Sequence, residues 1–365
     1  MPARAGRAVL PVPVAPGADA RSLLPRLRDA LAGRGPALAP YAAGSPPPAH
    51  LAEALVPEQV AVLLATSGST GAPRWVLLTA ENLLASAEAT HERLGGPGRW
   101  ALALPVDHVA GLQVLVRSVL AGLEPATELG DGRARYAALV PTQLHRLLDH
   151  SDQARALQRY DAVLVGGAAA SPTLLDRARA AGIAVVTTYG MTETAGGCVY
   201  DGLPLTGTQV RLDDEVIVLG GPTVALGYLD HPFPRQGGTA WFRTSDLGHL
   251  EGDRLVVRGR ADDVIVTGGL KVAPARVEQA ILRHLPCVSE ALVVGIPDPR
   301  WGHAVAAVLV TSRPLDAAAV RQALRGLVAD HELPRAVVTA AGIPSLGPGK
   351  PDRQRARDLF ETQPT

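Results

Sequence analysis

The 365-residue sequence contains little cysteine, few aromatic residues and no excess of charge of either sign. Its only cysteines, Cys198 and Cys287, are far apart and have no metal-ligand spacing, which argues against a disulfide framework and favours a reducing compartment, the cytoplasm. Lys and Arg together number 35, as do Asp and Glu, so no strong field points to nucleic acid or an anionic membrane.

Long apolar runs are also missing. No uninterrupted apolar stretch reaches membrane-spanning length, which argues against a transmembrane helix. The apolar patch near the N-terminus is interrupted by Pro11, Pro13 and Pro16, so it makes a poor signal peptide. Hydrophobic residues nevertheless make up 47% of the chain and charged residues 19%, which is ordinary for a soluble enzyme. The length of 365 residues is enough for two domains and a sizeable core.

Short apolar runs alternate with helical patterns from Val60 to about Val186. This alternation predicts a layered α/β domain with a largely parallel sheet, in which ligands bind beyond the carboxyl ends of strands. We expect strands at 60–64, 100–104, 137–140, 162–165 and 184–187, and helices at 23–31, 112–120 and 173–181. A further helix is expected to begin near Thr79, whose N-cap is only partial because Asn82 stands where a capping box has Glu or Gln.

The pattern changes after about Thr208. We expect short strands at 209–212, 215–219 and 255–259, then a small α+β region with helices at 274–285 and 316–327 and strands at 290–295 and 304–310. We therefore expect a large N-terminal layered α/β domain, residues 1–261, and a small C-terminal α+β domain, residues 262–365.

A stretch of small and hydroxyl-bearing residues, Ala65 to Arg74, follows the first of these strands. Glycine lets the backbone approach a ligand closely, and hydroxyl and N–H groups can surround phosphate oxygens. A solvent-exposed turn is the alternative interpretation. The stretch is not a Walker loop, because Gly71 is not followed by Lys.

The segment from Thr187 to Thr194 is the most specific local signal. Tyr189 offers a flat face for stacking on adenine, and Thr192 can hydrogen-bond an α-phosphate. Glu193 can ligate Mg²⁺, a hard ion that prefers oxygen ligands. This combination after a buried strand is difficult to explain as packing alone.

Four other segments contain candidate residues, each of which also has an ordinary structural interpretation. They are the turn with His108, the small-residue turn Gly166–Ala168, the segment Trp241–Gly248 with Asp246 and the glycine-flanked Lys350. A histidine, an acid or a lysine in such places is often only solvated. Two carboxylate oxygens do suit a vicinal diol, and a compact ammonium suits developing negative charge.

Together, in this order from Ala65 to Arg353, the segments resemble the adenylate-forming superfamily of acyl-CoA synthetases, peptide-synthetase adenylation domains and luciferases. The resemblance covers about four-fifths of the chain, with each motif in the predicted structural context that it requires. The superfamily usually has Lys where this chain has Arg74.

The resemblance implies roles for sets of residues. The cofactors would be bound by Thr66, Ser67, Gly68, Ser69, Thr70, Gly71, Arg74, Gly166, Gly167, Ala168, Tyr189, Gly190, Met191, Asp246, Arg260 and Lys271. Thr70 and Glu193 would hold Mg²⁺, and Asp262 would be the hinge of domain rotation. The catalytic residues would be Lys350, Thr192, Glu193 and His108, and the acyl substrate would contact His108, Arg117 and Gly190.

Two segments narrow the resemblance further. The group they resemble is the o-succinylbenzoate–CoA ligases of menaquinone biosynthesis, and the segments are Leu139–Leu144 and Gly196–Gly202. The phosphate loop also starts early in the chain, which implies a shortened N-terminal domain, and short chains of this kind resemble the same ligase group. The implied activity forms an acyl-adenylate and then an acyl-CoA thioester from an aromatic carboxylate, ATP, Mg²⁺ and coenzyme A. Neither nucleic acid nor a membrane is expected as a partner, and the oligomeric state stays open, a homodimer included.

Two rival interpretations stay open. One is another aryl- or acyl-CoA synthetase, or an adenylating domain that loads a carrier protein. The other is a non-catalytic nucleotide-binding protein, which only the replacement of Lys by Arg74 suggests. The retained Glu193, Asp246 and Lys350 argue against it.

Overall fold

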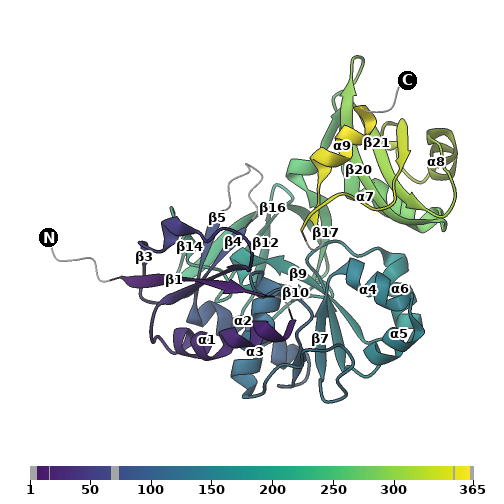
Figure 1. The fold of residues 1–365 in the computed structure, drawn as a ribbon. Helices are drawn as coiled ribbons and strands as arrows, with labels where there is room; N and C mark the ends of the chain where they lie inside the picture. The colour runs from purple at the N-terminus through teal and green to yellow at the C-terminus, as the bar shows by residue number, and fades with distance from the viewer. Residues whose placement is uncertain (1–5, 16, 67–73, 348–349, 362–365) are drawn as a thin grey trace.

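The computed structural model describes residues 6–15, 17–66, 74–347 and 350–361 (Figure 1). The chain has mixed α/β structure, with a large N-terminal part that contains helices α1 to α6. A small C-terminal part contains helices α7 to α9 and lies at the upper right of Figure 1. This agrees with the fold class expected from the sequence.

The first sheet of the large part has the strand order β14-β5-β4-β2-β1-β3. Its central strands are parallel, whereas β5 runs antiparallel to β4, and the edge strands β14 and β3 are also antiparallel to their neighbours. The strands are β1 (Arg7–Val14), β2 (Ala37–Ala42), β3 (Leu55–Val56), β4 (Val60–Thr66), β5 (Arg74–Thr79) and β14 (Gly227–Tyr228).

The second sheet has the order β11-β10-β9-β8-β7-β6. Strands β6 to β9 are parallel, and β10 and β11 return antiparallel beside β9. The strands are β6 (Trp100–Ala101), β7 (Tyr136–Leu139), β8 (Ala162–Val165), β9 (Val185–Met191), β10 (Gly196–Tyr200) and β11 (Leu203–Pro204).

Helices fill the space between these two sheets and cover the outer face of the second one (Figure 1). Between the sheets lie α1 (Leu24–Leu31), α2 (Ala80–Arg93) and α3 (Val109–Ala121), preceded by the 3-10 helix η1 (Gly17–Leu23). On the outer face lie α4 (Pro141–Leu148), α5 (Ser151–Leu157) and α6 (Pro172–Ala180). The short η2 (Ala49–Leu51) packs beside β1. The layered α/β arrangement is therefore confirmed.

A third, antiparallel sheet follows the second in the chain. It consists of β12 (Gln209–Asp213), β13 (Val216–Gly220), β15 (Arg235–Gln236), β16 (Thr239–Glu251) and β17 (Arg254–Arg260). Ile217 and Leu219 pack with Cys198 of β10, so this sheet is joined to the second one by a common apolar cluster.

The C-terminal part is built on β20 (Val288–Asp298), β21 (Gly302–Thr311) and β22 (Ala336–Thr339). The 3-10 helix η4 (Ala261–Asp263) leads into it, followed by β18 (Ile265–Thr267), β19 (Leu270–Val272), α7 (Pro274–His284), α8 (Ala317–Leu324), η5 (Asp330–Glu332), β23 (Ser345–Gly347), β24 (Lys350–Pro351) and α9 (Arg353–Glu361). Its hydrophobic clusters use residues from Ile265 to Phe360, whereas those of the large part end at Val257.

Most predicted elements are confirmed, although several differ in extent and some strands were not expected. The strand expected at 100–104 ends at Ala101, because Leu102 N–H donates to Ala126 outside the sheet. Helix α8 ends at Leu324 rather than at residue 327. Strand β5 was not expected, since its apolar residues lie between the small-residue stretch and the helix that begins after Thr79.

The start of α2 corrects the prediction of a partial cap. Asn82 N–H donates to Thr79 Oγ1, and Thr79 N–H donates to Asn82 Oδ1, both at 3.0 Å. The Asn82 amide group also donates to the carbonyls of Pro222 and Val224 at 2.8 and 2.9 Å. Asn82 therefore completes a capping box and joins the helix to a distant loop.

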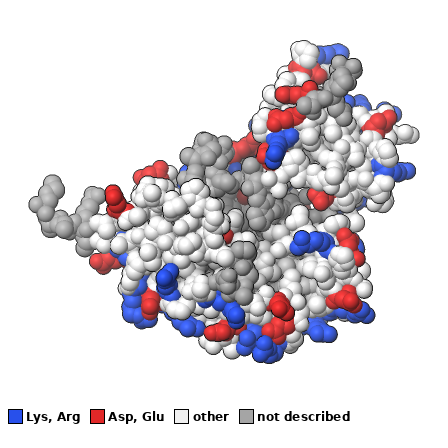
Figure 2. All heavy atoms as spheres, viewed as in Figure 1, with Lys and Arg blue, Asp and Glu red and all other residues white. Residues whose placement is uncertain are grey.

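Acidic and basic side chains are interspersed over the face shown in Figure 2, without a broad region of one sign. Among the helices that the structure describes, none combines the length and apolar character needed to cross a membrane. Both cysteines are free thiols, Cys198 being buried and Cys287 partly exposed.

Candidate active site

Two predicted residues meet where β9 and β16 lie near each other. The Tyr189 hydroxyl donates to Asp246 Oδ2 at 2.8 Å, and Arg260 Nη1 lies 3.6 Å from Asp246 Oδ1. Burial raises the pKa of the Asp246 carboxyl, while Tyr189 and Arg260 act in the opposite direction. Each carboxylate oxygen retains a further lone pair, so Asp246 can still accept hydrogen bonds from a diol.

Arg260 links this pair to the expected hinge. Its Nη2 donates to Asp262 Oδ2 at 2.9 Å. Burial acts to lower the pKa of Arg260, but the nearby carboxylates, Asp246 first among them, raise it. The structure thus brings Tyr189, Asp246, Arg260 and Asp262 into one chain of polar contacts.

Glycines shape the turns beside Tyr189. A Cβ on Gly190 would lie 2.2 Å from the Gly196 carbonyl, and one on Gly166 would lie 2.1 Å from Thr188 Oγ1. Met191 N–H donates a hydrogen bond to Thr194 Oγ1 at 3.0 Å. Close approach of β8, β9 and β10 therefore requires two of the predicted glycines, and Gly167 and Ala168 follow directly after β8.

Glu193 lies in the 3-10 helix η3 (Thr192–Thr194), immediately after β9. It is 7% exposed, and its Oε1 accepts a hydrogen bond of 2.7 Å from the Tyr228 hydroxyl. Its backbone carbonyl accepts from Ala225 N–H at 2.9 Å. The loop that ends in β14 therefore fixes both the main chain and the side chain of Glu193.

The ends of the predicted phosphate loop lie side by side. Thr66 and Arg74 are paired in the β4–β5 register, and the Thr66 hydroxyl donates to the Arg74 carbonyl at 3.3 Å. The Arg74 guanidinium lies over the Tyr228 ring, 4.3 Å from its centroid. The other predicted loop residues, Ser67, Gly68, Ser69, Thr70 and Gly71, lie outside the described residues.

His108 stands directly before α3, and its Nδ1 lies 3.3 Å from Asp107 Oδ1. The hydrogen bond with Asp107 raises the pKa of His108, and burial opposes this effect. Asp107 was not singled out in the sequence, although its position next to His108 was a signal that could have identified it.

Arg117 lies in a separate buried cluster on α3. It is 3% exposed, and its Nη2 donates to Thr90 Oγ1 and the Tyr200 hydroxyl at 3.3 and 3.4 Å. Its guanidinium lies 4.6 Å from the centroid of a Trp100 ring, and its Nε has no hydrogen-bond partner among the described residues. The described residues supply no carboxylate to this cation.

The two predicted lysines belong to the C-terminal part. Lys271 is exposed on β19, opposite Val266 of β18. Lys350 begins β24, whose backbone pairs with β23 at Gly347. Arg353, three residues further on, contacts Asp263 at 2.9 Å and Glu278 at 3.4 Å, and donates to the Val293 carbonyl at 2.7 Å.

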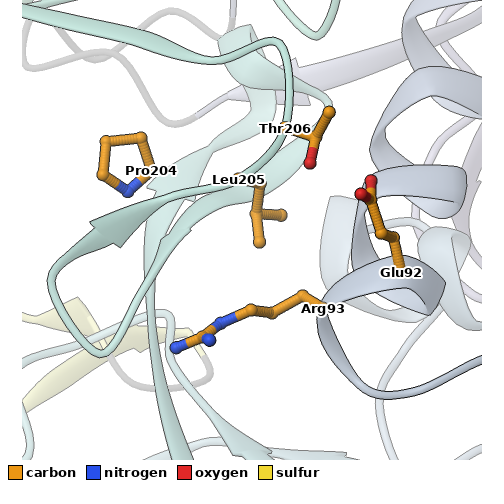
Figure 3. Close-up of a pocket in the computed structure, with 5 residues that line it drawn as sticks. All are labelled: Glu92, Arg93, Pro204, Leu205 and Thr206. Carbon is orange, nitrogen blue, oxygen red and sulfur yellow. The ribbon is translucent and has the colours of Figure 1, made fainter.

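A surface pocket elsewhere contains none of the predicted residues. Its volume is about 280 Å³, and it lies between the end of α2 and the segment after β11 (Figure 3). It is lined by Glu92, Arg93, Pro204, Leu205 and Thr206. We therefore place the candidate site at the Tyr189–Asp246 contact and at Glu193, which directly follows the strand of Tyr189.

Known proteins resemble this chain over most of its length. A probable 2-succinylbenzoate–CoA ligase of Mycobacterium tuberculosis is 44% identical over 369 residues, which cover 92% of this chain and 94% of the relative. The o-succinylbenzoate CoA synthetase (MenE) of Bacillus subtilis in complex with the acyl-adenylate intermediate OSB-AMP is 29% identical, with a TM-score of 0.72. The matched region covers 82% of this chain and 69% of that one.

The same Bacillus subtilis enzyme in complex with ATP and magnesium ion has a TM-score of 0.68 at 28% identity, covering 81% of this chain and 72% of that one. Residues 276–350 match the AMP-binding enzyme C-terminal domain. Residues 27–229, more than half of the chain, match the AMP-binding enzyme family, and the chain belongs to that family.

Proposed function

We propose that the chain is an ATP-dependent 2-succinylbenzoate–CoA ligase of menaquinone biosynthesis. The contact of Tyr189 with Asp246 carries the proposal, because it supplies groups for a nucleotide near the carboxyl end of the parallel strand β9, which Glu193 follows. The 44% identity to the Mycobacterium tuberculosis relative supports the choice of 2-succinylbenzoate as the acid.

The nucleotide would be recognised at three points. Asp246 would accept the ribose hydroxyls, the ring of Tyr189 would stack on adenine, and Thr192 would hydrogen-bond the α-phosphate. Gly166, Gly167 and Ala168 would leave room for the base, because they carry little or no side chain. Arg260 would contact the same Asp246 carboxylate that accepts the ribose hydroxyls, as the ion pair of these two residues suggests.

Glu193 fits a Mg²⁺ ion that accompanies ATP. Mg²⁺ is usually held by one or two carboxylates, substrate phosphates and water rather than by a protein cage. Within the described ranges no group of three or more His, Cys, Asp or Glu could form such a cage, so the single buried carboxylate of Glu193 suits this mode. The ion would neutralise phosphate charge, and Thr70 would be its second protein ligand.

The acyl substrate has two carboxylates, and one of them must be held without reacting. Arg117 is a buried cation without a described acidic partner, which suits a substrate carboxylate bound directly or through water. His108 and Gly190 would border the rest of the acyl pocket. Lys271, which is exposed on β19, would belong to the cofactor-binding residues.

The reaction would proceed in two steps. A succinyl carboxylate oxygen attacks the α-phosphorus of ATP, the bond to the bridging oxygen breaks and pyrophosphate leaves. The CoA thiolate then attacks the acyl carbon and AMP leaves with the electron pair of the broken C–O bond. The protein orients the reactants and stabilises charge, with Lys350 and Thr192 acting on the first step.

Rotation at Asp262 would switch the C-terminal part between the two orientations that serve the two half-reactions. The separation of hydrophobic clusters at residues 257 and 265 supports a domain boundary between 261 and 262. Asp262 belongs to the short η4 between these clusters, where a torsion change disturbs little packing. A cytoplasmic location and a homodimer complete the proposal, and light scattering after gel filtration tests the dimer.

The direct test is AMP release with 2-succinylbenzoate and CoA. We expect AMP, pyrophosphate and acyl-CoA in equal amounts, and no release when 2-succinylbenzoate is omitted. ATP–pyrophosphate exchange across a panel of acids distinguishes another acid–CoA ligase, which would prefer a different acid. Transfer to a carrier protein in place of CoA would instead identify an adenylating domain.

A further inference from the structure

Tyr228 is a buried residue that touches two charged groups of the candidate site. It lies in β14, is 4% exposed and belongs to none of the predicted site motifs. Its hydroxyl contacts Glu193, and its ring face contacts Arg74. One side chain therefore joins the acid at the end of β9 to the cation at the start of β5.

The hydroxyl acts on Glu193. Burial raises the pKa of Tyr228, so the hydroxyl stays protonated and donates to Glu193 Oε1 at 2.7 Å. A tyrosine has one proton to donate, which leaves Oε2 and one lone pair of Oε1 available. The hydrogen bond thus orients the carboxylate without consuming its capacity to bind a cation.

The ring acts on Arg74. Arg74 is exposed, and an unsupported guanidinium at a loop end samples many rotamers. Stacking on the aromatic face restricts it and leaves its N–H groups free for phosphate oxygens. An ammonium does not stack in this way, so the Tyr228 ring accounts for Arg at a position where the superfamily usually has Lys.

The surroundings fix the ring itself. Phe233 meets it edge-on, with centroids 5.0 Å apart, and β14 pairs with β5 so that Tyr228 stands opposite Val76. Leu229 N–H donates to the Trp75 carbonyl at 2.8 Å, directly beside Arg74. The ring is therefore held rigidly relative to the strand on which Arg74 lies.

We propose that Tyr228 is a positioning residue for the triphosphate and its metal ion. Its hydroxyl sets the orientation of Glu193, and its ring sets that of Arg74. This inference rests on the proposed function, since it assigns the two charged residues to the metal and the phosphates of ATP.

Two variants separate the two contacts. Tyr228→Phe removes the hydroxyl and keeps the ring, whereas Arg74→Lys keeps the charge and removes the planar stacking group. The readout is ATP binding, measured by calorimetry over a range of Mg²⁺ concentrations without acyl substrate. Tyr136→Phe is the matched control, because Tyr136 is also buried and donates to the carbonyls of Leu94 and Gly96.

We expect Tyr228→Phe to raise the Mg²⁺ concentration for half-maximal ATP binding by about tenfold, the effect of losing one hydrogen bond to a charged group. Binding of ATP without Mg²⁺ should stay unchanged. Arg74→Lys should weaken ATP binding with and without Mg²⁺ and leave the half-maximal Mg²⁺ concentration unchanged. Tyr136→Phe should match wild type in all three quantities.

An unchanged Mg²⁺ dependence in folded Tyr228→Phe would overturn the role of the hydroxyl, and unchanged ATP affinity in Arg74→Lys would overturn that of the ring. Arg74 is exposed, so its variant tests the proposal even if Tyr228→Phe melts early. If wild type binds no ATP, the proposed function itself fails, whereas identical binding by wild type and both variants rejects only the role of Tyr228.

Discussion

Arg117 shows how a single residue can point to a substrate. An uncompensated buried charge is costly, so a folded protein normally pairs it with an acid. Burial lowers the pKa of Arg117, and among the described residues only the hydroxyls of Thr90 and Tyr200 hydrogen-bond to it. A ligand carboxylate would supply the missing charge.

We predict that Arg117→Ala raises KM for 2-succinylbenzoate, because charge-assisted hydrogen bonding worth about 1.5–3 kcal/mol of binding free energy is lost. KM for ATP should barely change. Steady-state kinetics with both substrates measure the two constants. The control acid is 4-oxo-4-phenylbutanoate, which lacks the ring carboxylate and should be used equally by both proteins. An unchanged ratio of the two acids in a folded variant would show that Arg117 is the wrong residue.

Residue types of the candidate site were predictable from the sequence, but their contacts were only partly so. Tyr189 and Glu193 stood out in a specific motif after a predicted strand, whereas Asp246 stood out only through the resemblance to the adenylate-forming superfamily. Tyr228 did not, because its contacts with Arg74 and Glu193 join segments far apart in the chain. The only local signal was an aromatic residue at the end of a glycine-rich stretch.

At the scale of elements, the side chain of Arg7 connects strand β1 with helix α1 and strand β4. It lies at the start of β1, is 8% exposed and donates to the carbonyls of Ala30, Arg34, Gly35 and Val60 at 2.8–3.2 Å. These acceptors belong to the last turn of α1, the segment after it and the first residue of β4. The guanidinium therefore donates to carbonyls at and beyond the end of α1, where the helix supplies few N–H partners, and ties them to β4.

We predict that Arg7→Met lowers the free energy of unfolding by at least about 2 kcal/mol, because several acceptors lose a charged donor. Urea denaturation followed by circular dichroism measures the change. Arg34→Met is the matched control. It breaks only an exposed pair with Asp29, and such pairs are worth less than about 1 kcal/mol. Equal losses in the two variants would reject the role given to Arg7.

Element boundaries were predicted best where a local pattern decides them. Strands β7 and β8 are within one residue of expectation, because short apolar runs between turns define them. Strand β5 was missed because its partner β4 lies across the small-residue stretch, and pairing across a loop leaves no local periodicity. The cap at Asn82 was underestimated because two of its partners are the carbonyls of Pro222 and Val224, far away in sequence.

At the scale of the whole molecule, no hydrophobic cluster contains residues from both sides of η4, which supports the proposed domain rotation. A torsion change at Asp262 would not take apart either hydrophobic cluster, since neither cluster includes this residue. The ion pair of Asp262 with Arg260 is half-exposed, so it offers little resistance to rotation.

We predict that Asp262→Pro leaves adenylation intact and stalls CoA transfer, because proline fixes φ and holds one orientation. Pyrophosphate release and thioester formation from supplied acyl-adenylate measure the two steps separately. Asp262→Ala, which loses the ion pair but keeps backbone freedom, should perform both. In contrast to Asp262→Pro, Lys350→Ala should lower adenylation by roughly a hundred- to a thousandfold and leave thioester formation from supplied acyl-adenylate intact. Normal turnover in Asp262→Pro would place the hinge elsewhere.

Each part of the molecule contains one free cysteine, and the two thiols should react with a labelling reagent at different rates. Burial raises the pKa of Cys198 to about 12, whereas hydrogen bonds from Arg313 and Thr311 lower that of Cys287. A thiol-specific reagent should therefore label Cys287 in the native protein at once and Cys198 only when β10 separates from its neighbours. The slow labelling rate reports local opening next to Tyr189, and bound ATP should slow that rate alone.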